Sequence, residues 1–193
     1  MPPANPMILR QFRRNPRRDT IAALYGVIVA CARQPAFYRE YSVPDTVNGR
    51  LEMIILHLAL LTRRLDVEGD VGRDLAQGLF DLFCSDMDGN LREMGVGDLA
   101  VPRQMRSVGE AFYGRRRAYD AALAEQDTGA LAAALSRNVY CHAQSGDVAG
   151  ADRLVVYVRR SVDSLGRAPL DRLAEPGVGF PDPASIDAGV LGQ

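Results

Sequence analysis

The sequence contains no lysine, so all 23 of its basic side chains are arginines, a bias that we interpret as GC-rich coding. It also has only two histidines, His57 and His142, and three cysteines, Cys31, Cys84 and Cys141, with no CxxC pair. Histidine-based catalysis, a zinc site and a disulfide framework therefore have few residues available. We assign no catalytic residue, metal or cofactor, and we expect reduced thiols in a cytosol-like compartment.

An excess of charge of one sign is also absent. The 23 basic residues face 24 acidic ones, for a net charge of −1, which excludes a uniformly basic nucleic-acid binder and argues against specific DNA binding. A chain of 193 residues buries about 70% of the surface of its unfolded form, so it needs no disulfide or metal for stability. One compact domain is the expectation.

The run Ile21–Ala32 is too short to span a bilayer as a helix, so we do not expect a transmembrane helix there. It follows a basic leader, and Ala30-Cys31-Ala32 resembles a signal-peptidase site, so a secretory signal is one interpretation. The other is a packed amphipathic helix, because apolar residues recur at three- and four-residue spacing. These residues are Ile21, Leu24, Ile28 and Cys31. The spacing favours the packed helix.

Helical periodicity dominates the rest of the chain, and no segment has a convincing strand pattern. Five main helices are predicted, over about 46–65, 71–95, 102–125, 128–143 and 147–158. Asp45 or Thr46, Thr128 and Asp147 are the expected N-caps. The predicted fold is all-α, a single multi-helix bundle over residues 19–168. The Pro- and Gly-rich residues 169–193 are expected to form a loose tail.

Residues 1–18 are predicted to form a basic arm, because they hold five arginines, four prolines and no acid. We expect this arm to contact an anionic membrane surface or ribosomal RNA. The candidate contact residues are Arg10, Arg13, Arg14, Arg17 and Arg18.

Charge is segregated in the middle of the chain. Residues 81–98 hold five acids and a single arginine, whereas residues 103–117 hold five arginines and a single acid. The two stretches either pair within the molecule or contact a partner. The partner-binding candidates are Arg92, Glu93, Asp98, Arg103, Arg115, Arg116 and Arg117. Because Asp98 follows two glycines, we expect its carboxylate to accept amide hydrogen bonds at the next helix start.

Two stretches of the sequence partly match ligand-binding motifs, but neither fits the full pattern. The string Asp86–Asn90 resembles a calcium loop, but Leu91 and Gly97 stand where the loop needs Gly and Glu. The glycines of Gly95-Val96-Gly97 follow a predicted helix, whereas a dinucleotide fingerprint follows a strand. No phosphate loop or nucleophile elbow is present, and we interpret His57 as a core histidine rather than a catalytic base.

Three strings of the sequence resemble the ubiquinol-cytochrome c chaperone family, assembly factors for respiratory complex III. The first runs from Phe37-Tyr38-Arg39 through VPDTVNGRLEMIILHL to Arg64-Leu65, the second is DLFCSDMDGNLREMGVGDLAVPRQM, and the third is AFYGRRRAYDAAL. Together they lie within residues 37–123. The piece LREMGVGDLAVP is the most specific, because no periodicity argument would produce it.

The resemblance implies an all-helical, non-enzymatic chaperone whose client is cytochrome b or another complex III subunit. Mitochondrial members of the family work with a small partner protein near the ribosome and inner membrane. The lack of lysine favours a bacterial member, located in the cytoplasm or peripherally on the cytoplasmic face of the inner membrane. A mitochondrial location is the alternative for a eukaryotic protein.

Two other function classes remain open from the residues alone. One is a small enzyme that would draw on Arg92, Glu93, Asp98 and His57. The other is an RNA- or ribosome-associated helical protein. A pocket converging on those four residues would favour the enzyme, whereas an exposed apolar groove flanked by arginines would favour the chaperone.

Overall fold

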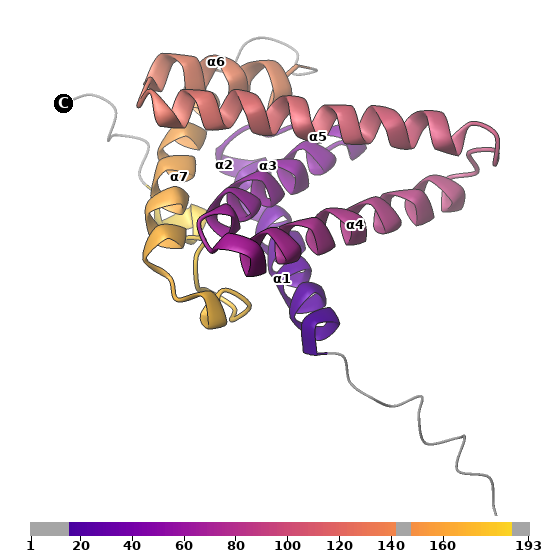
Figure 1. Ribbon diagram of the computed structural model, residues 1–193. Coiled ribbons are helices and arrows are strands. Elements are labelled where there is room, and N and C mark those ends of the chain that lie inside the picture. Colours follow the sequence, from indigo (N-terminus) through magenta and orange to yellow (C-terminus); the bar gives the residue numbers. More distant parts are fainter. Residues whose placement is uncertain (1–15, 142–147, 187–193) are drawn as a thin grey trace, which may run out of the picture.

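The computed structural model describes residues 16–141 and 148–186, and in these ranges it contains helices and no strand (Figure 1). The α-helices are α1 Pro16–Ala32, α2 Pro35–Glu40, α3 Val47–Asp66, α4 Gly69–Glu93, α5 Val101–Ala124, α6 Thr128–Val139 and α7 Val148–Arg167. Two 3₁₀ turns follow, η2 Leu170–Arg172 and η3 Pro183–Ser185. The all-α prediction is confirmed: the five predicted main helices are α3 to α7, and α1 and α2 precede them.

Helix α3 forms the centre of the molecule and packs against α1, α4, α5 and α7. Its sequence is apolar on nearly every side, and the side chains from Met53 to Leu61 are all buried. A helix with this composition is stable only when other helices cover it all round. The Thr46 hydroxyl accepts a 3.1 Å hydrogen bond from the Gly49 amide, which confirms Thr46 as the N-cap.

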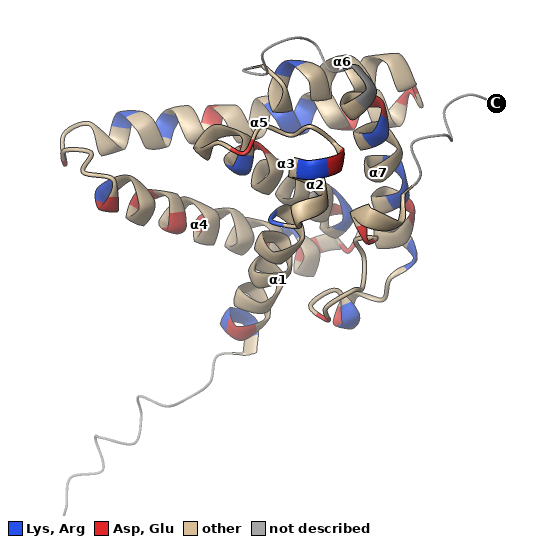
Figure 2. Cartoon of the chain, turned by 180° about the vertical axis from the view of Figure 1, so that it is seen from behind, with Lys and Arg blue, Asp and Glu red and all other residues tan. Residues whose placement is uncertain are grey.

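Helix α1 is the packed helix that the spacing favoured. Leu24 and Ile28 are buried against the core, and the Tyr25 hydroxyl donates a 2.8 Å hydrogen bond to Asp86 on α4. The stretch Pro16–Glu40 is nevertheless long and apolar enough to cross a membrane by length and composition. Its only charges before Arg33 lie at the N-terminal end, so most of the α1 ribbon is tan in Figure 2.

Of the predicted N-caps, Thr128 is wrong and Asp147 is not described. The N-cap of α6 is Asp127, whose carboxylate accepts from the Ala130 amide at 3.0 Å, and Thr128 is the first helical residue instead. Helix α6 ends at Val139, before the predicted end near Ala143. The predicted cap Asp147 lies outside the described residues.

The prediction of a loose tail is wrong for residues 169–186. Leu173, Phe180 and Ile186 are buried, and the carbonyl of Pro183 accepts a 2.7 Å hydrogen bond from the buried Tyr41 hydroxyl. Phe180 packs against His57 with a 4.9 Å centroid separation. This segment is therefore packed although it is rich in proline and glycine, because its few large apolar side chains are buried in the core. Residues 187–193 lie outside the described ranges.

Helices α4 and α5 form a hairpin that projects from the bundle (Figure 1). The two helices converge at the connecting loop and separate toward their other ends, where both pack against α3. Charged residues lie along both helices of the hairpin, up to its far end (Figure 2). The hairpin thus carries residues of both charge-segregated stretches, although Arg115 and Arg116 lie at the end that packs against α3.

Candidate functional site

The far end of the hairpin, residues 92–103, exposes large apolar side chains and is called the hairpin tip below. Leu99 is 99% exposed and Met94 is 58% exposed, whereas Val101 is buried and anchors the start of α5. Burying a leucine stabilises a structure by about 1.5–3 kcal/mol. Leu99 contributes none of that stabilisation to this fold, and it is more exposed than Val67 at 78% or Val71 at 63%.

The backbone of the tip is set by a glycine turn at the end of α4. Gly95 has a φ of +81°, a left-handed conformation that favours glycine. The amide of Gly95 donates to the carbonyl of Arg92, and that of Val96 donates to Leu91, both at 3.0 Å. These bonds satisfy the last carbonyls of α4 in the manner of a Schellman motif and turn the chain sharply toward α5.

Arg92 stabilises this turn through two ion pairs. Its guanidinium donates to Asp88 at 2.7 Å within α4 and to Asp98 at 2.6 Å across the loop. The two carboxylates, Asp88 foremost, raise the pKa of Arg92 above its ordinary value. The expectation that Asp98 caps α5 is wrong, because the N-cap is Ala100 and makes no side-chain cap bond. Asp98 instead accepts from Arg92 and is otherwise exposed.

Glu93 and Arg103 are exposed, and within the described part of the chain neither has an ion-pair partner. They lie on either side of the exposed apolar residues, so the tip offers one open negative and one open positive charge. Both are among the residues predicted to bind a partner.

Of the four predicted arginines on α5, Arg115 and Arg116 form ion pairs within the fold. Arg115 donates from Nε and Nη2 to the two carboxylate oxygens of Glu52, both at 2.5 Å, and Glu52 is buried. Arg116 pairs with Asp66 and, at 3.6 Å, with Asp120. Arg117 is exposed and forms no ion pair within residues 16–141 and 148–186.

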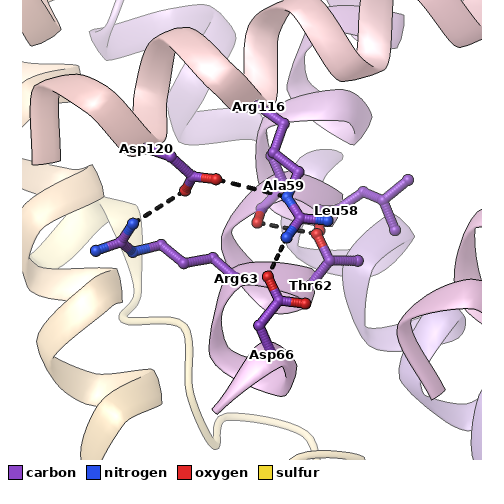
Figure 3. A network of polar contacts seen from close by, with 7 residues as sticks. All are labelled: Leu58, Ala59, Thr62, Arg63, Asp66, Arg116 and Asp120. Atoms are coloured by element: carbon purple, nitrogen blue, oxygen red, sulfur yellow. Dashed lines mark hydrogen bonds and ion pairs between the residues drawn. The ribbon is translucent and has the colours of Figure 1, made fainter. Parts of the chain in front are cut away.

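The Arg116 pairings belong to a network between α3 and α5, shown in Figure 3. Asp120 accepts from Arg63 at 3.0 Å and also faces Arg116, so it joins the two helices. The predicted intramolecular pairing is therefore present, but its acids come from α3 and from α5 itself. No described ion pair joins the acidic stretch 81–98 to the basic stretch 103–117.

Two surface grooves lie elsewhere on the molecule, and neither is lined by residues of the tip. The first has a volume of about 380 Å³ and lies between the end of α3 and α7, where Leu60 and Val162 form apolar walls beside Arg63 and Arg64. The Arg64 guanidinium is held there by Glu68 at 2.5 Å and by carbonyls at the end of α7. The second, called the α4–α5 groove, has a volume of about 220 Å³, and its lining combines aromatic side chains with charged ones. The aromatic residues are Phe80, Phe112 and Tyr113, and the charged residues are Asp66, Arg73 and Arg116.

His57 does not belong to any surface site. It is fully buried, and burial lowers its pKa to about 4. Because a carbonyl only accepts, His57 Nδ1 donates to Met53 at 2.7 Å and Nε2 accepts from the Tyr157 hydroxyl at 2.7 Å. The four residues considered for an enzyme site therefore do not converge. Within the described residues, no group of three His, Cys, Asp or Glu side chains is placed to hold a metal ion.

The predicted arm is described only at its end. Arg17 and Arg18 lie in the first turn of α1, and Arg10, Arg13 and Arg14 lie outside the described residues. Arg17 donates to the carbonyl of Asp74 at 3.0 Å, so one arm residue contacts α4.

Sequence reasoning did not single out Met94 and Leu99 as exposed. A usable signal was present, since both large apolar residues flank the Gly-Val-Gly turn within the string LREMGVGDLAVP. Periodicity assigns such residues to a helix face, and it cannot show that the loop lies beyond the core.

Comparison with known proteins gives a consistent set of relatives. The family model described as "Ubiquinol-cytochrome C chaperone" matches residues 39–180. The chain is 31% identical over 156 residues to ubiquinol-cytochrome-c reductase complex assembly factor 1 of Xenopus laevis, covering 80% of this chain and 77% of the relative. The Drosophila melanogaster factor of that name is 28% identical over 163 residues, covering 81% of this chain and 62% of the relative.

A solved structure agrees with these relatives. The crystal structure of the Cbp3 homolog from Brucella abortus superposes with a TM-score of 0.79 at 40% identity, covering 94% of this chain and 100% of that one. The chain spans less than half of the Mus musculus factor, 43% of its length.

Proposed function

Because this chain belongs to the ubiquinol-cytochrome c chaperone family, we propose that it is a non-enzymatic assembly chaperone for the ubiquinol-cytochrome c reductase complex. The relatives named as assembly factors of that complex support this role, as does the family match over residues 39–180. The burial of His57 away from the surface charges supports a role without catalysis.

The client in this proposal is cytochrome b or another subunit of the complex, and the hairpin tip is its contact surface. An unassembled membrane subunit exposes apolar segments that water would drive to aggregate. Contact with Met94 and Leu99 would remove apolar surface of both molecules from water. The observation that carries the proposal is the nearly complete exposure of Leu99 at the end of a projecting hairpin.

The charged residues of the tip would give this contact its orientation. Glu93 and Arg103 are open to pair with a client, while Arg92 and Asp98 hold the loop in shape. Charges at the rim of an interface steer association more than they strengthen it. Arg117, which has no ion pair in the described structure, adds a second positive charge on α5. Arg115 and Arg116 instead form ion pairs with α3 and hold α5 in place.

The experiment for this proposal is capture of the client by the tagged full chain from its own membranes, with cytochrome b detected by antibody and by haem. Leu99→Asp should reduce the captured cytochrome b by about tenfold or more, the loss expected for one buried anchor residue. Val71→Asp is the matched control, because Val71 is 63% exposed on α4 away from the tip. Equal capture by both variants would remove the tip from the mechanism.

The basic arm is proposed to hold the chaperone at the cytoplasmic face of the membrane or near the ribosome. This contact is electrostatic, so it should weaken as salt rises and the Debye length falls below about 8 Å. Removal of residues 1–15 should reduce sedimentation with phosphatidylglycerol vesicles while leaving the melting temperature unchanged. Salt-insensitive sedimentation would exclude the arm from membrane attachment.

A further inference from the structure

The α4–α5 groove presents an aromatic surface that the fold leaves partly open. Phe80 of α4 stacks on Phe112 at 4.9 Å and on Tyr113 at 5.1 Å between ring centroids. Phe112 is buried, but Tyr113 is 55% exposed. The volume of about 220 Å³ is enough for one further aromatic ring, so the groove can hold a side chain of another molecule.

The charged residues that line the groove already have partners within the fold. Arg116 pairs with Asp66 and Asp120, and Arg73 pairs with Asp70 within α4. The lining by itself therefore offers a ligand no free charge. Any charge that recognises a ligand must come from residues beside the groove.

Free arginines lie on either side of Tyr113 on α5. Arg106 precedes Tyr113 by seven residues and Arg117 follows it by four, so at about 100° per residue both lie within about 40° of it around the helix. Both arginines are exposed, and neither forms an ion pair with any described residue. At a rise of about 1.5 Å per residue, they stand about 10 Å and about 6 Å from Tyr113 along the axis. The open aromatic ring is therefore flanked by two available cations.

One acid, Glu110, lies between these two arginines on the exposed side of α5. It stands four residues after Arg106, is exposed, and forms no ion pair within the described part of the chain. A continuous polyanion, such as RNA or an anionic bilayer, would bring negative charge against this carboxylate as well as against the arginines. A segment with two separate acids avoids that repulsion. The charge pattern therefore favours a discrete acidic segment over a polyanion.

We propose that the α4–α5 groove is a docking site for an acidic segment of a partner protein that carries one aromatic side chain. The ring enters the groove against Phe80 and Tyr113, and two carboxylates pair with Arg106 and Arg117. In an extended segment, at about 3.3 Å per residue, acids three positions to one side of the ring and two to the other match the two arginine spacings. The groove shares no residue with the hairpin tip, so this docking stands whether or not the proposed function holds.

The test is a titration of the ¹⁵N-labelled full chain with the peptide acetyl-Glu-Gly-Gly-Phe-Gly-Glu-amide, followed by NMR. Saturable shifts are expected at the amides of groove residues, among them Gln77, Phe80 and Tyr113. Replacing the peptide's phenylalanine by alanine, or both of its glutamates by glutamine, should weaken binding about threefold or more, because a stacked ring or two exposed charge pairs are lost.

Variants of the chain separate the free arginines from charge in general. Arg106→Gln with Arg117→Gln should weaken binding of the peptide about threefold or more. The matched control is Arg137→Gln with Arg160→Gln, which removes the same charge from exposed sites on α6 and α7 and should leave the affinity unchanged. Leu99→Asp should also bind the peptide normally, so a failure of the tip and a failure of the groove are distinguishable. The amide spectrum of each variant shows whether it is folded.

Four results would overturn the proposal. They are the absence of saturable shifts at millimolar peptide, shifts confined to residues outside the groove, equal affinities in the two double variants, and tighter binding of oligouridylate or dihexanoyl phosphatidylglycerol than of the peptide through the same two arginines. The last result would identify a general polyanion surface instead.

Discussion

The ion pair between Glu52 and Arg115 shows how residues that attract attention as a binding patch can instead hold the core. Glu52 is buried and accepts both bonds of the guanidinium. Removal of one partner from a buried pair leaves a charge without compensation. Arg115→Ala should therefore lower the free energy of unfolding by about 3 kcal/mol, measured by urea denaturation.

Arg117→Ala is the control for this variant, because Arg117 is exposed and unpaired in the described structure. It should change the free energy of unfolding by about 0.5 kcal/mol or less. If the two variants are equally stable, the Arg115 pair is not structural.

His57 gives a second prediction at the residue scale, on the pH dependence of stability. Burial lowers its pKa in the folded state to about 4, against about 6.5 when unfolded. Between these values the unfolded chain binds a proton that the folded chain does not. The free energy of unfolding should fall as pH drops from about 6.5 to 4, by up to about 1.4 kcal/mol per pH unit.

His57→Gln should flatten this part of the pH profile of urea denaturation, since the titrating group is gone. His142→Gln should keep it. A slope that persists unchanged in His57→Gln would assign the pH dependence to another group.

At this scale the sequence predicted some roles and missed others for a clear reason. His57 was assigned to the core because it lies within an apolar helix, which is local information. The partners of Arg115 and Arg116 lie 63 and 50 residues away in the chain, so only the folded structure identifies them. Asp98 differs, because its partner Arg92 is only six residues away, but their contact depends on the path of the glycine turn between them, which the sequence does not give.

The α4–α5 turn gives a prediction at the scale of the element. Gly95 has a positive φ, whereas Gly97 does not, and an added Cβ at either position would meet nothing within 4 Å. Gly95→Ala should therefore lower the melting temperature, for a loss of about 1 kcal/mol from backbone strain alone. Gly97→Ala should leave the free energy of unfolding nearly unchanged, and an equal loss in both would contradict the turn described.

Helices were easier to predict than the segments between and after them. The apolar spacing of α3 and α5 is long and regular, so their limits agree with the prediction to within about a residue or two. The segment 169–186 has no period, and its burial depends on separate contacts of Leu173, Phe180 and Ile186. No local pattern in the sequence predicts such contacts.

For the molecule as a whole, the all-helical fold and the family followed from the sequence, but the shape of the hairpin did not. Periodicity finds α4 and α5 without showing where they leave the bundle. The exposure of Met94 and Leu99 follows from that projection.

The most direct test of the proposed role is complementation of a strain that lacks the gene. Assembled cytochrome b and quinol-cytochrome c reductase activity should fall in the deletion strain, while cytochrome b message stays normal. The wild-type chain and Val71→Asp should restore both, whereas Leu99→Asp, expressed at an equal level, should not. Normal reductase in the deletion strain would contradict the chaperone role, and full rescue by Leu99→Asp would contradict the hairpin tip as its client surface.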